Sequence, residues 1–176
     1  MTHIRGFTLY ELLVTLGLVA LLLSIGLPSF SSALARNRQT IEINALFHAF
    51  HLARKESIMR RKVVSLCPSR DAATCLPGTD WSTGWIMFEN ADRDSPPQID
   101  PGESVLNTHQ VADSIRIQAN RRGFTLRATF LRATNGTLVV CDDEERIRPR
   151  GLIVSYTGRP RVALERPDGK TYTCAD

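Results

Sequence analysis

The sequence lacks the motifs of the common enzyme classes. It contains no nucleophile elbow, no glycine-rich phosphate loop, no HExxH zinc motif and no pair of carboxylates at catalytic spacing. These absences argue against an enzyme. We therefore expect a non-catalytic protein that needs no cofactor and holds no metal.

Charge is almost absent from the N-terminal part of the chain. From Phe7 to Leu27 the only charged side chain is Glu11. These twenty-one residues are enough to cross the hydrocarbon core of a membrane as a helix. A carboxylate in such a segment costs about 2.5–3.5 kcal/mol, which makes it a functional candidate. No small-residue cleavage site follows the apolar run, so we expect the run to be retained as a membrane anchor.

Cysteine is absent from the anchor and scarce after it. The four cysteines are Cys67, Cys75, Cys141 and Cys174, and the chain has no CxxC pair, which argues against a zinc knuckle. Arg5 favours a cytoplasmic N-terminus, and this orientation places the cysteines in an oxidising periplasm. Three disulfide pairings are possible. We favour Cys67–Cys75, because it closes a short polar loop. Cys141–Cys174 then ties the C-terminal end to a strand.

The residues that follow the anchor have the number and composition expected of one small folded domain. The chain has 176 residues, and 43% of them are hydrophobic, which is enough for a core after the anchor is subtracted. The net charge of +4 permits an anionic partner. Much of the positive charge is arginine, whose guanidinium group suits phosphate better than lysine does. Arginine-rich surfaces are nevertheless usually just solvated.

Helical periodicity resumes after Pro28. Apolar residues recur at the spacing of one helix face, namely Ile43, Leu46, Phe47, Phe50 and Ala53. We predict one helix over residues 7–60, with 7–27 in the membrane and 28–60 amphipathic. Pro28 removes one backbone hydrogen bond and is expected to kink this helix.

Two histidines lie on the predicted helix. His48 and His51 are three residues apart, a spacing that can in principle bind a metal. No acid or cysteine stands nearby at ligand spacing. We interpret both as surface histidines.

From Lys62 onward the pattern changes to that of β-strands. Short β-rich runs separated by turn signals cover 63–66, 84–88, 114–117, 124–130, 137–141, 152–156 and 162–164. We predict an α+β fold, in which the long N-terminal helix packs on an antiparallel β domain of residues 61–176.

The segment after the second predicted strand is acidic. Its carboxylates are Glu89, Asp92, Asp94, Asp100 and Glu103. Such a cluster of oxygen ligands can bind calcium. However, the glycine at the sharp turn of an EF-hand loop is missing, and solvated acidic loops have the same composition. Both interpretations stay open.

Arginines alternate in two segments near the C-terminus. Arg159 and Arg161 lie two residues apart, so on extended backbone they point to the same side. Three further arginines repeat this spacing upstream, namely Arg146, Arg148 and Arg150. If the two segments are neighbours, five guanidinium groups line one edge and can follow a phosphate backbone without reading sequence. The competing interpretation is a tight turn with solvated arginines, partly neutralised by the acids at 142–145. No aromatic platform for single-stranded nucleic acid is evident.

The N-terminal residues carry a family resemblance. Gly6-Phe7-Thr8-Leu9-Tyr10-Glu11-Leu12 resembles the class III signal of type IV pilins and type II secretion pseudopilins. The resemblance implies that a prepilin peptidase cuts after Gly6 and methylates the new amine of Phe7. It also implies that Glu11 pairs with the N-terminal amine of a neighbouring subunit and that Pro28 is the family's helix-kinking proline. Tyr10 departs from the aliphatic residue that is usual there.

Motifs farther along narrow the resemblance to GspH/FimT-type minor pilins and cover nearly the whole chain. They are Leu66-Cys67, Trp81-Ser82-x-Gly84-Trp85-Ile86-x-Phe88, Gly102-Glu103-x-Val105-Leu106 and Ser155-x-Thr157-Gly158-Arg159-x-Arg161. This resemblance implies a minor pilin of the inner membrane, with a periplasmic C-terminal domain, that is incorporated in a type IV pilus or initiates one. The H-type minor pseudopilin of a type II secretion system shares these features and is the alternative.

The same resemblance raises a possible nucleic-acid partner. Some FimT-type pilins are DNA receptors for transformation, and their DNA-binding motif is similar to Gly158-Arg159-Pro160-Arg161. It implies DNA, bound without sequence specificity, as an additional partner besides other pilins.

Overall fold

The computed structural model describes residues 8–128 and 132–174. Within these residues the chain forms one helix, α1 (Leu9–Arg60), followed by eight strands. The chain divides into two compact units between Leu34 and Ala35, so the first unit holds the N-terminal part of α1 and the second holds the rest of α1 with all the strands.

The first unit is an apolar helix whose side chains are exposed. Leu9, Leu22 and Ile25 expose 76%, 73% and 76% of their surface. A window of 18 residues in α1 has a mean hydropathy of 2.2, and none of it is buried. By length and composition this helix can therefore cross a membrane.

In the second unit, the rest of α1 packs on the sheets. Four residues of the predicted apolar stripe are buried, namely Ile43, Leu46, Phe50 and Ala53, and Phe47 is half-buried. The predicted core-facing side of this helix segment is thus confirmed. The buried Gln39 adds a polar link, because its side-chain amide donates to the carbonyl oxygens of Val140 (3.0 Å) and Arg148 (2.9 Å).

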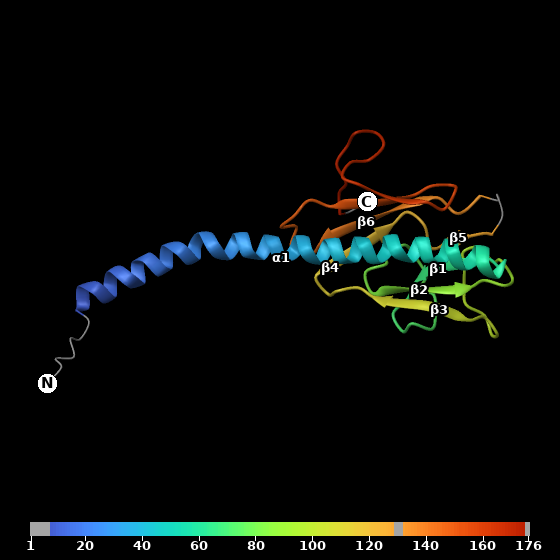
Figure 1. Ribbon diagram of the computed structural model, residues 1–176, viewed down its shortest axis with the longest axis horizontal. Coiled ribbons are helices and arrows are strands. Elements are labelled where there is room, and N and C mark those ends of the chain that lie inside the picture. The colour runs from blue at the N-terminus through green and yellow to red at the C-terminus, as the bar shows by residue number, and fades with distance from the viewer. Residues whose placement is uncertain (1–7, 129–131, 175–176) are drawn as a thin grey trace. The chain divides into compact units, whose positions relative to one another are not determined.

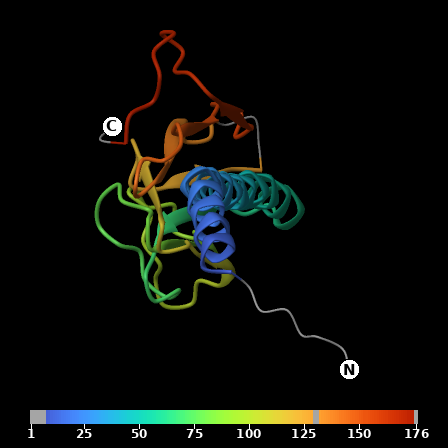
Figure 2. The ribbon, with the colours of Figure 1, turned by 90° about the vertical axis from the view of Figure 1, so that its left-hand side faces the viewer.

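Two antiparallel sheets make up the β domain. Sheet A has the order β3 (Val105–Gln110), β2 (Gly84–Glu89), β1 (Val64–Pro68), β5 (Phe124–Leu126). Sheet B has the order β4 (Ile115–Ala119), β6 (Gly136–Asp142), β7 (Arg150–Val154), β8 (Pro160–Ala163). Figure 1 shows residues 35–60 of α1 in front of the sheets, with β6 of sheet B above the helix and β2 and β3 of sheet A below it, and Figure 2 shows the same domain from the side. The predicted α+β architecture, a long helix on antiparallel sheets, is confirmed.

The outer face of each sheet is covered by a segment that a disulfide holds. On sheet A, Cys67 pairs with Cys75 and packs with Ile86 and Phe88. On sheet B, Cys141 pairs with Cys174. The structure therefore has the two pairings expected from the sequence.

The segment that covers sheet B is the C-terminal one. The ring of Tyr172 packs with Val139 and Cys141 and lies directly over Gly151. A side chain at position 151 would overlap this ring, so the glycine is what lets the C-terminal segment lie flat on the sheet.

Most predicted strands are found with ends that differ by one or two residues, and three differences have a physical reason. Strand β3 was not predicted, because residues 107–110 are all polar and give no apolar alternation. The expected strand 124–130 ends at Leu126 as β5, and residues 129–131 lie outside the described part. Strand β7 ends at Val154 rather than at 156, because the backbone turns at Ser155, whose carbonyl oxygen accepts from the amide of Gly158 (2.8 Å).

Candidate functional site

The first candidate site is the N-terminal turn of α1. Gly6 and Phe7, the predicted cleavage site, lie outside the described residues. Glu11 lies in the first turn of α1, where the helix dipole favours a carboxylate. The hydroxyl oxygen of Thr8 accepts a hydrogen bond from the backbone N–H of Glu11 (3.3 Å). Thr8 is therefore the N-cap of this helix, a role that the capping-box pattern Thr8-x-x-Glu11 would have revealed but that the sequence analysis missed.

Pro28 lies inside α1, as predicted. Because proline has no N–H, one intrahelical hydrogen bond is missing there. The hydroxyls of Ser31 and Ser32 donate to the carbonyl oxygen of Pro28 at 2.9 and 3.1 Å. The predicted kink stays a prediction.

The second candidate site is the connection between β7 and β8, residues 155–159, which we call the hairpin tip. The amide of Ser155 donates to the carbonyl oxygen of Arg159 (3.1 Å). Gly158 has φ of +73°, a left-handed conformation that glycine adopts without steric cost. This turn closes the hairpin and leaves Arg159 directly before β8, two residues before Arg161.

The strand register decides which way the arginines point. Arg161 pairs with Ile153 of β7, and directly paired residues share a face of the sheet. Leu152 and Val154 are buried in the core, so Ile153 and Arg161 lie on the opposite, outer face. Arg159 and Arg161 are both exposed, and among the described residues neither forms an ion pair with an acid.

The expected edge of five arginines is not formed. Arg150 is two residues before Leu152 on β7 and so lies on the core side of sheet B, whereas Arg161 lies on the outer side. Arg150 also pairs with Val140, near the end of β6, while the tip follows Val154, which pairs with Gly136 at its start. The upstream arginine segment precedes β7 and the hairpin tip follows it. The two segments therefore lie at opposite ends of this strand.

Arg146 forms ion pairs with two acidic side chains. Its guanidinium group donates to both carboxylate oxygens of Asp142 (2.8 and 2.7 Å), whose side chain is fully buried, and lies 3.3 Å from a carboxylate oxygen of Glu144. The hydrogen bonds from Arg146 hold the pKa of Asp142 below its usual value, although burial opposes the shift. Arg146 is therefore a structural residue, and the expectation that it joins a phosphate-binding edge is wrong.

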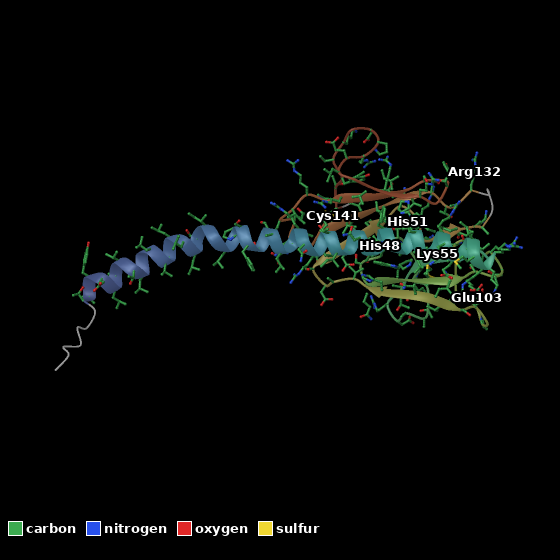
Figure 3. All side chains as sticks on the ribbon, in the orientation of Figure 1. His48, His51, Lys55, Glu103, Arg132 and Cys141 are labelled. Atoms are coloured by element: carbon green, nitrogen blue, oxygen red, sulfur yellow. A yellow bond between two sulfur atoms is a disulfide. The ribbon has the colours of Figure 1, made fainter. Side chains whose placement is uncertain are left out.

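Three residues that the sequence analysis did not select complete the hairpin tip. The guanidinium group of Arg54 on α1 donates to the carbonyl oxygen of Thr157 (2.5 Å). The guanidinium carbon of Arg132 lies 5.4 Å from the ring centroid of Tyr156. Figure 3 places Arg132 and Cys141 at opposite ends of sheet B. The position of Tyr156 just before the Thr157-Gly158 turn was a signal of an exposed aromatic ring, whereas nothing in the sequence pointed to the other two.

The acids of the acidic segment fall into two groups, a cluster of three aspartates and two glutamates that bind groups of the protein itself. Carboxylate oxygens of Asp92, Asp94 and Asp100 lie within 4.8 Å of one another, and burial raises the pKa of Asp94. Glu89 instead pairs with Lys62 (2.5 Å) and Arg60 (2.8 Å). A hydrogen bond from Lys62 is the main cause of its lowered pKa.

Glu103 accepts hydrogen bonds from the backbone amides of Ala91 (2.6 Å) and Asp100 (3.0 Å). The acidic loop is thus organised by its own backbone contacts. Three of the five acids remain as calcium candidates.

The histidines on α1 lie on its surface. His48 and His51 are exposed, and their rings lie 5.9 and 4.6 Å from the ring of Phe47. Figure 3 shows them on α1 with Lys55. In the described residues they belong to no cluster of three metal-ligating side chains.

Comparisons with known proteins agree with this architecture. The family model of the type II transport protein GspH matches residues 42–158. The solved structure of the type IV minor pilin FimU of Pseudomonas aeruginosa is 20% identical, with a TM-score of 0.54, and the match covers 79% of this chain and 96% of FimU. The minor pseudopilin EpsH of the Vibrio cholerae Type 2 Secretion System is 10% identical, with a TM-score of 0.52, over 72% of this chain and 96% of EpsH.

A search of curated proteins found no match. At these identities the two solved structures show a shared fold, and the family model shows the family. Because that model spans the last turns of α1, strands β1 to β7 and the hairpin tip up to Gly158, the chain belongs to the family of the type II transport protein GspH and is a minor pilin or pseudopilin of the GspH/FimT type.

Proposed function

We propose that this protein is a structural, non-catalytic minor subunit of a type IV pilus. The observation that carries the proposal is the exposed apolar surface of the first unit, attached to a domain that has its own buried core. An apolar helix of this length is stable only in lipid or against other apolar helices. A filament subunit has both environments in turn, first as a single-pass protein of the inner membrane and then in the filament.

The N-terminal turn has a defined role in this proposal. A prepilin peptidase cuts after Gly6 and methylates the amine of Phe7. In the filament, Glu11 pairs with the N-terminal amine of a neighbouring subunit. In an apolar interface such a pair depends strongly on distance, so it sets the axial register between helices.

One observation favours a second machine. The fold is also that of the pseudopilin EpsH, so the alternative is an H-type minor pseudopilin of a type II secretion system. The test is to tag the protein in cells that make only one of the two filaments and to probe sheared surface filaments and membrane fractions. We expect the tag in sheared type IV pili. A tag found only with the secretion filament would replace the pilus with the pseudopilus.

We further propose that the hairpin tip binds DNA through its phosphates. Arg159 and Arg161 support this step, because they are exposed, lie two residues apart and lack an acidic partner in the described part of the chain. Guanidinium groups pair well with phosphate. Contacts of this kind carry no sequence information, so binding is weak and indifferent to sequence.

The salt dependence of binding tests this proposal. The variant Arg159→Gln with Arg161→Gln removes about two phosphate contacts, and each contact contributes about 0.9 to the slope of log K against log salt concentration. We therefore expect the slope for duplex DNA to fall by about 1.8. The matched control is Arg148→Gln with Arg150→Gln, which removes the same charge at the other end of β7 and should leave the slope unchanged. An unchanged slope in the first variant would contradict the assignment.

A further inference from the structure

The hairpin tip combines an exposed aromatic ring with its arginines. Tyr156 is the second residue of the turn and exposes 56% of its surface. Tyr156 precedes Arg159 by three residues in the same turn, which is closed by a hydrogen bond from the amide of Ser155 to the carbonyl oxygen of Arg159 (3.1 Å). Arg132 lies against the ring, with its guanidinium carbon 5.4 Å from the centroid. An exposed aromatic ring with one cation against it therefore lies in the same turn as Arg159.

The tip is held in place from three directions. Arg54 of α1 donates to the carbonyl oxygen of Thr157 (2.5 Å). The amide of Ala133 donates to the carbonyl oxygen of Tyr156 itself (2.8 Å). Gly158 is buried, and a Cβ built on it would lie 3.1 Å from a methyl carbon of Leu126. Because these contacts fix the backbone on both sides of the turn, the ring is presented at a defined place.

An exposed ring next to guanidinium groups suits unpaired bases. A tyrosine on the surface of a folded domain normally covers apolar neighbours or is buried to a larger extent. The ring of Tyr156 instead has a cation beside it and more than half of its surface open. Proteins that bind single-stranded nucleic acid without reading sequence pair a basic surface with such rings, on which bases stack. In a duplex the bases are already stacked on one another and cannot use the ring without being flipped out.

We propose that the hairpin tip prefers single-stranded DNA, with one base stacked on Tyr156 and the neighbouring phosphates bound by Arg159 and Arg161. This inference rests on the proposed DNA binding and adds the form of the ligand. Arg132 has a positioning role, because its cation–π contact orients the ring. The structure thus supplies the aromatic platform that the sequence analysis did not find.

The test uses the full-length chain in detergent micelles with three fluorescent probes. The probes are an oligothymidine, the same backbone without bases, and a blunt duplex of equal length. Tyr156→Ala is compared with Tyr156→Phe, which keeps the ring. Stacking on an aromatic side chain is lost on alanine substitution, so we expect Tyr156→Ala to weaken binding of oligothymidine roughly 5- to 150-fold. Duplex and abasic binding should change less than about 2-fold, and Tyr156→Phe should behave like the wild type.

Each outcome decides something different. If Tyr156→Ala binds oligothymidine as tightly as the wild type, or if all three probes weaken equally, the stacking site is refuted and phosphate binding stands. If the wild type binds and Arg159→Gln with Arg161→Gln binds every probe equally well, the two arginines do not bind the phosphates. In that case the affinity lost in Tyr156→Ala alone decides whether the ring contacts DNA. If the wild type binds no probe at low salt, both the proposed DNA binding and this inference are refuted.

Discussion

Removing the Cys141–Cys174 disulfide should destabilise the β domain more than removing Cys67–Cys75. The two bridges close loops of different length, with sequence separations of 33 and 8. In the chain-entropy description, a disulfide stabilises the fold because it lowers the entropy of the unfolded chain. The entropy lost is about 2.1 + 1.5R ln n cal/mol/K, where n is the number of residues in the loop that the disulfide closes. At 25 °C this relation gives about 3.7 kcal/mol for the long loop and about 2.5 kcal/mol for the short one.

The two pairs make a matched comparison. Cys67 and Cys141 are both buried, with 0% and 2% exposure, and Cys75 and Cys174 are both half-buried. Replacing each pair by alanines therefore removes similar packing. The remaining difference of about 1.3 kcal/mol reports the difference in loop length.

Urea unfolding of the full-length chain in micelles measures this difference. The only two tryptophans, Trp81 and Trp85, are both buried in the β domain, so their fluorescence follows that domain without the apolar helix. With an m-value of about 2 kcal/mol/M, the Cys141→Ala/Cys174→Ala midpoint should lie about 0.6 M below that of Cys67→Ala/Cys75→Ala. Equal midpoints, or the reverse order, would refute the loop-closure reasoning. Non-reducing peptide mapping of the wild type checks the pairing itself.

Two further predictions concern single acids. Glu11→Ala should still be cleaved and inserted but should be strongly depleted from sheared filaments, because the partner amine loses its counter-charge; normal amounts there would count against the register role. Asp142→Asn should cost about 3 kcal/mol at neutral pH, because it breaks a buried pair with Arg146. The pKa of Asp142 is lowered in the fold, so its contribution is complete above the unfolded value of about 3.9 and is lost as pH falls through the lower folded value. The unfolding midpoint of the Asn variant should therefore depend less on pH in this acidic range, and equal pH dependence of variant and wild type would contradict the assignment.

The general architecture could be predicted from the sequence because its signals are local. The apolar run, the stripe around Leu46 and Phe50, and the short β-rich segments each follow from periodicity within one element. The edge strand β3 could not be found this way. Its residues 107–110 are polar, and they form a strand because β2 offers them partners.

The arrangement of the arginines could not be predicted, because it depends on strand register. Moving the pairing of β7 and β8 by one residue would turn Arg161 from the outer face to the core. Nothing in the spacing of the arginines carries this information. The pair of Asp142 and Arg146, in contrast, was accessible as an acid and a base four residues apart.

The covalent ring closed by Cys141 and Cys174 contains β7, the hairpin tip and β8. Suppose that a ligand held by Arg159 and Arg161 is pulled along the filament axis. Tension at the tip then acts on the hydrogen bonds between β7 and β8 and on the contact between Arg54 and Thr157. If β8 separates from β7, the chain can lengthen only within the ring, whose ends are 33 residues apart, and the load passes through the disulfide to β6. The bridge therefore limits how far the tip can extend under force, and the ligand stays tethered to α1.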